Sequence, residues 1–167
     1  GNNLLKMRST ARRLKAENNL SLIVVDYLQL ILPLKNYDSM VNQITEISRG
    51  LKLLAKELDV PVIALSQLSR AVEQRGGEPR LSDLRDSGSI EQDADIVMFI
   101  HSEDSHKPRE DRTNGKKILV EKHRKGATGA IELYFDANKT TFLSVEKNGY
   151  DDFNNEYPAY QDDGFSA

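Results

Sequence analysis

Apolar residues recur at helical spacing in two segments of the chain. The first repeat predicts an amphipathic helix across about 3–18, and a more regular one predicts a helix across about 39–58. The repeating residues are Leu4, Met7, Ala11 and Leu14 in the first segment and Met40, Ile44, Ile47, Leu51, Leu54 and Leu58 in the second.

Short apolar runs predict three strands that alternate with these helices. The runs cover 20–25, 60–65 and 96–100, and a short helical stretch capped by Ser82 precedes the third run. Successive strands separated by helices imply parallel strands joined by right-handed crossovers. The sequence therefore predicts an α/β fold with a parallel sheet.

The rest of the pattern predicts an antiparallel extension and a tail. Residues 117–122 and 130–135 flank a polar turn and are expected to form a β-hairpin, to which 141–145 adds a last strand. Residues 147–167 are acidic and lack apolar periodicity, so we expect them to be disordered. The expected organisation is one folded domain, 1–146, followed by this tail.

The amino-acid composition limits the classes of protein to which this chain can belong. The chain is 38% hydrophobic and 29% charged, and none of its apolar runs reaches the roughly 18 residues that a membrane-spanning helix needs. It contains no cysteine, which excludes disulfides and is compatible with the cytoplasm. His101, His106 and His123 lack the spacing of a zinc site. We expect a soluble cytoplasmic domain.

The net charge of −3 averages over segments of opposite sign. Residues 6–15 carry five basic side chains and no acidic one, whereas 146–167 carry six acidic side chains and a single lysine. The acidic tail thus masks a more basic folded part, so the net charge does not exclude a nucleic-acid surface there.

Polar side chains end the first two predicted strands. Asp26 follows four apolar residues, the pattern with which nucleotide hydrolases hold Mg²⁺ directly or through water. Gln67 ends the next strand and would lie near Asp26 if the strands are neighbours, and its amide could contact a γ-phosphate and a water. A strand-ending aspartate can equally cap a helix or bind loop amides, and surface glutamines commonly have no role.

The predicted hairpin carries two cations on one face. Lys122 and Arg124 are two residues apart, so a strand projects them to the same side. Such a pair suits an anion, including the phosphates of a nucleotide bound by a neighbouring subunit. A solvated basic hairpin is the alternative.

A third group of polar residues follows Leu84. Arg85 supplies charge and Gly88 lets backbone amides approach a phosphate, which together would hold a nucleic-acid backbone without reading bases. Alternatively, Ser-Gly-Ser joins two helical turns and Arg85 pairs with Asp83 or Asp86.

An arginine-rich segment lies just upstream, across about 70–81. Its glycines and proline oppose regular structure, so we expect an exposed loop. Arg70 and Arg75 would contact single-stranded nucleic acid or lie in solvent, and Glu73 and Glu78 reduce the positive charge.

Four motifs occur together in an order that resembles the DnaB-type hexameric replicative DNA helicases. They are Asp-Tyr-Leu-Gln-Leu (26–30), Ala-Leu-Ser-Gln-Leu-Ser-Arg (64–70), the run from Arg80 to Asp95, and Lys-His-Arg-Lys-Gly-Ala-Thr-Gly (122–129). The resemblance covers about 4–146. It implies a partial RecA-like P-loop NTPase core in a homohexameric ring, with ATP between subunits and single-stranded DNA in the channel.

The resemblance implies roles by position. Asp26 would act on Mg²⁺ and Gln67 would sense the γ-phosphate of ATP, while Lys122 and Arg124 would reach the ATP site of the neighbouring subunit. The DNA backbone would be held by Arg85, Gly88 and the main chain of Asp86, with Arg70 and Arg75 nearby.

One departure from the family limits what the chain can do. The sequence has neither Gly-x-x-x-x-Gly-Lys-Ser/Thr nor the upstream strand that carries the family's catalytic glutamate. We therefore expect this chain to be inactive alone and to belong to a longer ATP-dependent helicase that moves on single-stranded DNA. Primase and a helicase loader are the partners that the family implies.

Two other classes of function also fit parts of the sequence. One is another RecA-like ATPase, a recombinase or a clock-type protein, which Asp26 and Gln67 would also suit. The other is a truncated, non-enzymatic paralogue that binds DNA or a helicase ring.

Overall fold

The computed structural model describes residues 3–35, 37–69, 72, 75–84, 88–104 and 107–145. The predicted tail, 147–167, lies outside these residues. The helices are α1 (Leu4–Glu17), α2 (Met40–Leu58) and α4 (Gly88–Asp93), with 3-10 turns at Leu28–Leu30, Leu81–Asp83 and Arg109–Asp111. The strands are β1 (Ile23–Val25), β2 (Val62–Ala64), β3 (Ile96–His101), β4 (Gly115–His123), β5 (Gly129–Asp136) and β6 (Thr141–Ser144).

Side-chain caps define where the two long helices begin. The side chain of Asn3 accepts a 2.9 Å hydrogen bond from the Lys6 N–H at the start of α1, and Ser39 accepts one of 3.2 Å from the Val41 N–H at the start of α2. Both predicted helices are thus confirmed within about two residues. Glu57 of α2 forms an ion pair with Arg8 of α1, which ties the helices together.

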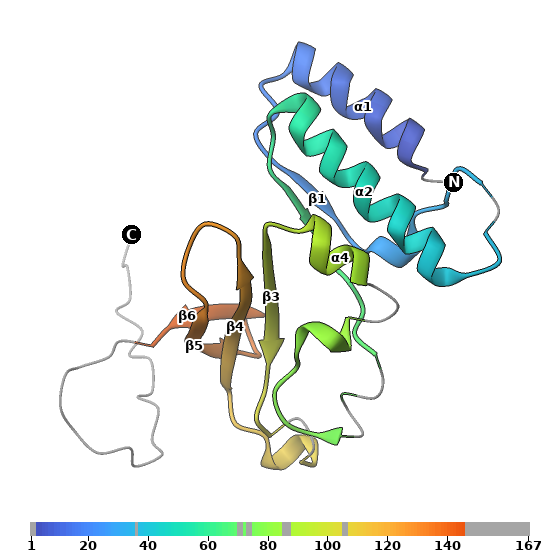
Figure 1. The fold of residues 1–167 in the computed structure, drawn as a ribbon. Helices are drawn as coiled ribbons and strands as arrows, with labels where there is room; N and C mark the ends of the chain where they lie inside the picture. Colours follow the sequence, from blue (N-terminus) through green and yellow to red (C-terminus); the bar gives the residue numbers. More distant parts are fainter. Residues whose placement is uncertain are drawn as a thin grey trace, which may run out of the picture.

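The strands β1 and β2 form a two-stranded parallel sheet, as predicted. Ile23 pairs with Val62 and Val25 with Ala64. Both α1 and α2 lie along one side of this sheet (Figure 1). The core between them consists of Leu4, Val25, Leu28, Ile31, Ile47 and Leu51.

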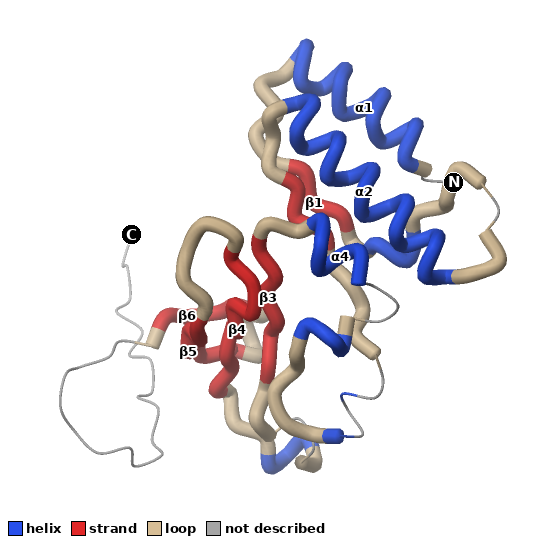
Figure 2. The backbone as a smooth tube through the Cα atoms, in the orientation of Figure 1, coloured by secondary structure: helices blue, strands red, loops and turns tan. Residues whose placement is uncertain are grey.

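The strand β3 corrects one topological prediction. The sequence predicts that it extends the parallel sheet, but it lies at the edge of a separate four-stranded antiparallel sheet with the order β3-β4-β5-β6 (Figure 2). The apolar run 96–100 predicts a strand but does not encode its direction. Because the chain returns after the polar segment 102–114, β4 lies alongside β3 and pairs with one side of its backbone from Ile96 to His101.

Helix α4 joins the two sheets. Its Ile90 packs against the core beneath α1 and α2 and also against a second core beside the antiparallel sheet. That second core consists of Leu84, Val97, Phe99 and Leu119. The fold is therefore mixed α/β, with a small parallel sheet and a larger antiparallel one connected through α4.

The parallel sheet and β3 each bury one face and expose the other. Val24 of β1 is 59% exposed and Ile100 of β3 is 65% exposed, although apolar runs of this kind predict strands covered on both faces. Ile63 of β2 and Met98 of β3 are exposed in the same way. Apolar surface of this extent is typical of a face that another structural element covers. In the described part of the chain, none of the helices combines the length and apolar character needed to cross a membrane.

Candidate functional site

Asp26 and Gln67 lie just beyond the carboxyl ends of adjacent parallel strands. The ladder between β1 and β2 continues past the sheet, because the Leu65 N–H donates to the Val25 carbonyl at 2.9 Å and the Leu28 N–H donates to the Leu65 carbonyl at 2.9 Å. The expectation that these two strands are neighbours is confirmed. Both residues lie at this edge of the sheet, where ligands of α/β proteins bind.

Gln29 connects the two strand ends and was missed from the sequence. Its Oε1 accepts a 3.3 Å hydrogen bond from the Gln67 N–H, and its Nε2 donates to the Ser66 hydroxyl at 3.2 Å. The half-buried side chain of Gln29 thereby fixes the backbone that carries Gln67. The feature of the sequence that could have indicated this role is the polar Gln29 inside the otherwise apolar stretch 28–32.

A groove of about 610 Å³ lies between α1 and β1, with Asp26 and Tyr27 among its lining residues. Most of the lining is apolar, and Lys6 is its one basic side chain among the described residues. A polyphosphate requires several positive groups or backbone amides. The groove on its own therefore does not provide a phosphate site.

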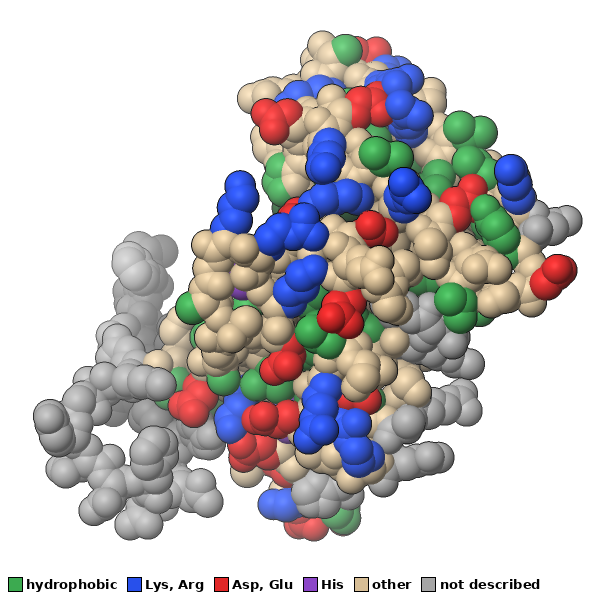
Figure 3. Space-filling view, viewed as in Figure 1, with side chains coloured by type: hydrophobic (Ala, Val, Ile, Leu, Met, Phe, Trp, Pro, Cys, Tyr) green, Lys and Arg blue, Asp and Glu red, His purple; other side chains and the backbone are tan. Residues whose placement is uncertain are grey.

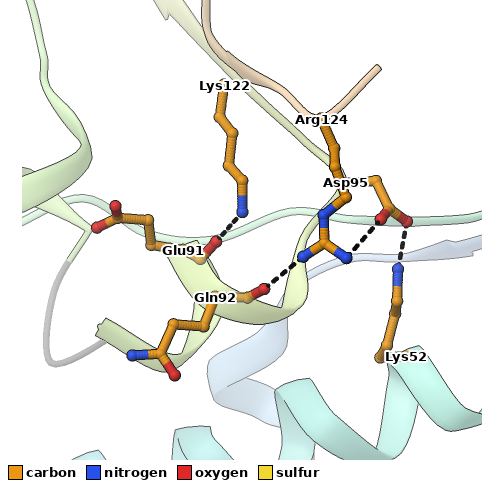
Figure 4. Close-up of polar contacts among 6 residues, drawn as sticks. All are labelled: Lys52, Glu91, Gln92, Asp95, Lys122 and Arg124. Atoms are coloured by element: carbon orange, nitrogen blue, oxygen red, sulfur yellow. Dashed lines mark hydrogen bonds and ion pairs between the residues drawn. The ribbon is translucent and has the colours of Figure 1, made fainter.

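Lys122 and Arg124 project to the same side, toward the carboxyl-terminal end of α4 (Figure 4). Lys122 donates from its Nζ to the Glu91 carbonyl, and Arg124 donates from Nη2 to the Gln92 carbonyl at 2.9 Å. These carbonyls belong to the last turn of α4, where helix carbonyls lack partners within the helix and attract cations. The predicted common orientation of the two cations is confirmed by this geometry.

Asp95 and Lys52 complete this cluster. Lys52 of α2 donates to Asp95 Oδ2, while Asp95 Oδ1 lies 3.6 Å from Arg124 Nη1 (Figure 4). The hydrogen bond from Lys52 is the main cause that lowers the pKa of Asp95 below its usual range, with Arg124 and Lys122 adding to it against the effect of burial. No sequence pattern pointed to this pair, because Lys52 and Asp95 are far apart along the chain.

Arg75, which the sequence predicts to contact DNA, forms hydrogen bonds to nearby residues of its own chain. Its guanidinium makes two hydrogen bonds to Asp83, at 2.9 and 2.7 Å, and donates to the Glu78 carbonyl at 3.2 Å. Asp83 is only 6% exposed and also accepts the Arg80 N–H at 2.8 Å. Hydrogen bonding from Arg75 is the main cause that lowers the pKa of Asp83.

The other predicted DNA contacts are only partly described. Arg70, Arg85 and Asp86 lie outside the described residues. Gly88 is the first residue of α4, and a Cβ atom placed on it would meet no other described atom within 4 Å. Packing within the described part of this chain therefore does not require glycine at this position.

Comparison with known proteins places these features in a family. Residues 1–144 match the family model described as the DnaB-like helicase C-terminal domain. The chain is 46% identical over 162 residues to the replicative DNA helicase DnaB of Rickettsia typhi, covering 86% of this chain and 33% of that protein. It is 47% identical over 143 residues to the replicative DNA helicase DnaB of Geobacillus stearothermophilus, covering 84% and 32%.

Solved structures share the fold. One comes from a study of a DnaB-like replicative helicase and its interactions with primase, with a TM-score of 0.82, 44% identity, and coverage of 87% of this chain and 36% of that one. Another is an ATPase domain, with a TM-score of 0.81, 44% identity, and coverage of 87% and 52%. The chain spans about a third of the length of the curated relatives it matches. It belongs to the DnaB-like helicase C-terminal domain family.

Proposed function

We propose that this chain is part of the RecA-like motor of a replicative DNA helicase, which couples ATP hydrolysis to movement on single-stranded DNA and to unwinding. The observation that carries the proposal is that Asp26 and Gln67 lie just beyond the carboxyl ends of two adjacent parallel strands, β1 and β2. Family membership supports the same function.

Asp26 holds Mg²⁺, directly or through water, and Gln67 contacts the γ-phosphate of ATP. The residues fit this role because Mg²⁺ usually takes one or two protein carboxylates and fills its other positions with water and phosphate oxygens. Asp26 supplies an exposed carboxylate, and the amide of Gln67 can both donate and accept. Bound Mg²⁺ neutralises charge on the phosphates.

Lys122 and Arg124 act on the nucleotide of an adjacent subunit in a six-membered ring. Half of the Arg124 side chain is exposed, so another subunit can reach it. Lys and Arg side chains gather across the middle of one face, over α2, α4 and the neighbouring ends of β3 and β4 (Figure 3). A planar guanidinium at this surface suits the charge that develops during phosphoryl transfer.

Single-stranded DNA is held by Arg70, Arg85, Gly88 and the main chain of Asp86. Of the residues predicted to bind DNA, Gly88 and Arg75 lie in the described part of the chain, and their surroundings support different roles. A Cβ atom on Gly88 would meet no described atom within 4 Å, whereas Arg75 stabilises the loop through Asp83. Backbone contacts of this kind bind DNA without base specificity.

The isolated chain is inactive, because its sequence lacks a Gly-x-x-x-x-Gly-Lys-Ser/Thr loop to hold the phosphates. The exposed apolar faces of β1, β2 and β3 are consistent with a domain that is larger in the complete protein. Primase and a helicase loader are partners of that protein in the cytoplasm. One of the matched structures is of a DnaB-like helicase studied with primase.

Subunit mixing tests the proposal in the full-length protein. Asp26→Asn disables the site of its own subunit but keeps Arg124, whereas Arg124→Ala keeps its own site but cannot act on a neighbour. Each variant alone should lose most ATP turnover, about 10³-fold or more for Arg124→Ala. Mixed rings should recover turnover, because some interfaces then combine an intact Asp26 with an intact Arg124.

A mixture that is no more active than its separate components would contradict action between subunits. Retention of nucleotide binding by Arg124→Ala, measured with a fluorescent ATP analogue, separates a catalytic loss from a failure to bind.

A further inference from the structure

Asp95 lies where helix α4 passes into strand β3, beside the end of β4. Its main-chain carbonyl accepts a 2.8 Å hydrogen bond from the Arg124 N–H. Its carboxylate faces the Arg124 guanidinium, with 3.6 Å between Oδ1 and Nη1 (Figure 4). One residue thus contacts both the backbone and the side chain of Arg124.

Arg124 needs such support because β4 ends at His123 and the chain turns immediately afterwards. A long, half-exposed arginine has many rotamers in solvent, so holding it in one orientation has a cost in side-chain entropy that specific contacts must offset. Two separate acceptors, the Gln92 carbonyl and the Asp95 carboxylate, restrict the guanidinium from different sides.

Lys52 determines how Asp95 interacts with Arg124. It makes a direct hydrogen bond to Oδ2, whereas Arg124 lies farther away at Oδ1. Lys52 neutralises much of the negative charge of the Asp95 carboxylate. The cluster of Lys52, Lys122, Arg124 and Asp95, with three cations and one carboxylate, therefore keeps a net positive charge. Asp95 can therefore orient Arg124 without cancelling the charge that a phosphate would meet.

We propose that Asp95 is a positioning residue that holds the Arg124 guanidinium in the orientation in which it meets the nucleotide of the adjacent subunit. This inference rests on the proposed action of Arg124 between subunits and adds a residue that touches no nucleotide itself. Asp95 lies on the segment that leaves α4, so the same contact links the position of Arg124 to the helix that begins at Gly88.

The test is Asp95→Asn in the full-length protein. The substitution keeps the size of the side chain and the main-chain contact but removes the charge facing Arg124. We expect kcat for ATP hydrolysis to fall by about 10- to 100-fold while KM changes by less than about twofold, because misorientation affects the transition state more than binding. Asp95→Glu, which restores the charge, should recover most of the lost kcat.

Mixed rings supply a readout that a purely structural role would not change. Rings of Asp95→Asn and Asp26→Asn subunits should be more active than rings of either variant alone, because the Asp26→Asn subunit brings an intact pair of Asp95 and Arg124 to its neighbour. Glu103→Gln is the matched control, since Glu103 is also an exposed carboxylate bound to a lysine, Lys117, and lies near the opposite end of β3. It should leave kcat unchanged.

The outcomes separate this inference from the proposed function. If Asp95→Asn keeps the original kcat while Arg124→Ala is inactive, the positioning role is wrong and the proposed function stands. A loss of kcat in Asp95→Asn that mixing with Asp26→Asn does not repair places its effect within one subunit, which also overturns the inference. If Arg124→Ala itself hydrolyses ATP normally, the action between subunits fails, and the role of Asp95 fails with it.

Discussion

The Gln67 N–H donates a 3.3 Å hydrogen bond to the side-chain oxygen of Gln29, which lies three residues after Asp26. A displacement of Gln67 on contact with phosphate would therefore be transmitted to the segment that follows Asp26. Since Gln29 also binds the Ser66 hydroxyl, it holds both strand ends in one geometry.

Replacing Gln29 with alanine should lower DNA-stimulated ATP turnover of the full-length protein by about 10-fold, because Gln67 would lose its fixed position. Gln67→Ala should have the larger effect. The control is Gln43→Ala, on α2 away from the strand ends. Steady-state kinetics with and without single-stranded DNA measure the effect, and an unchanged kcat in Gln29→Ala would show that the hydrogen bond has no role.

Arg75→Ala should reduce stability more than DNA binding. The change removes two hydrogen bonds to Asp83 and leaves a buried carboxylate with fewer partners, so the free energy of unfolding should fall, although the 42% exposure of Arg75 limits the loss. Urea unfolding gives the loss, and fluorescence anisotropy with labelled single-stranded DNA gives the affinity. Arg85→Ala should show the reverse pattern, with weaker binding and little change in stability.

Sequence patterns predicted the helices and strands well because each long helix has an apolar stripe and each strand an apolar run. They failed for the partner of β3, because a run such as Ile96–Ile100 is the same in a parallel and an antiparallel sheet. Partner choice depends on which strand the chain brings alongside, and that follows from tertiary packing.

The same limit applied to the candidate site. Asp26 and Gln67 could be placed because both end predicted strands of one sheet. Asp95 and Gln29 could not, because their roles depend on contacts with Lys52 and Gln67, which are distant in sequence. For Arg75 the sequence allowed two environments, bound to nucleic acid or free in solvent. Neither includes its pairing with Asp83, because a loop of this composition has no periodic pattern that predicts internal contacts.

Stability should fall in acid partly because of Asp104, a buried carboxylate that organises the segment between β3 and β4. Burial opposes ionisation, but hydrogen bonds from the Ser102 hydroxyl, at 2.7 Å, and from the Thr113 N–H outweigh it and hold the pKa of Asp104 well below its usual range. The ionised form is therefore favoured in the folded state. Its contribution is complete above the unfolded pKa of about 3.9 and declines progressively below it.

Urea unfolding at pH values from about 6 to 2 measures this contribution. Asp104→Asn should lower the free energy of unfolding at neutral pH and flatten its dependence on pH below about 4. An acid dependence equal to that of the unchanged protein would assign the acid sensitivity to other carboxylates, such as Asp83.

Gly126→Ala should disturb the turn that follows Arg124. A Cβ atom on Gly126 would collide with the imidazole ring of His123, so the ring or the turn must move. We expect a loss of about 1–3 kcal/mol in stability together with reduced ATP turnover in the full-length protein. Gly129→Ala is the control, because a Cβ atom there meets no described atom within 4 Å. Combining Gly126→Ala with His123→Ala should relieve the collision, and failure of this rescue would contradict the steric explanation.

Asp59→Gly should stabilise the fold. Asp59 ends α2 in the left-handed region, with φ of 50° and ψ of 51°, and its N–H and that of Val60 both donate to the Ala55 carbonyl. A side chain strains the backbone in this conformation, whereas glycine adopts it freely, so we expect a gain of about 0.5–1 kcal/mol despite the greater entropy of glycine in the unfolded chain. Asp59→Ala keeps a Cβ atom and should give no such gain. A rise in the urea midpoint for both variants would instead attribute the effect to removal of the charge.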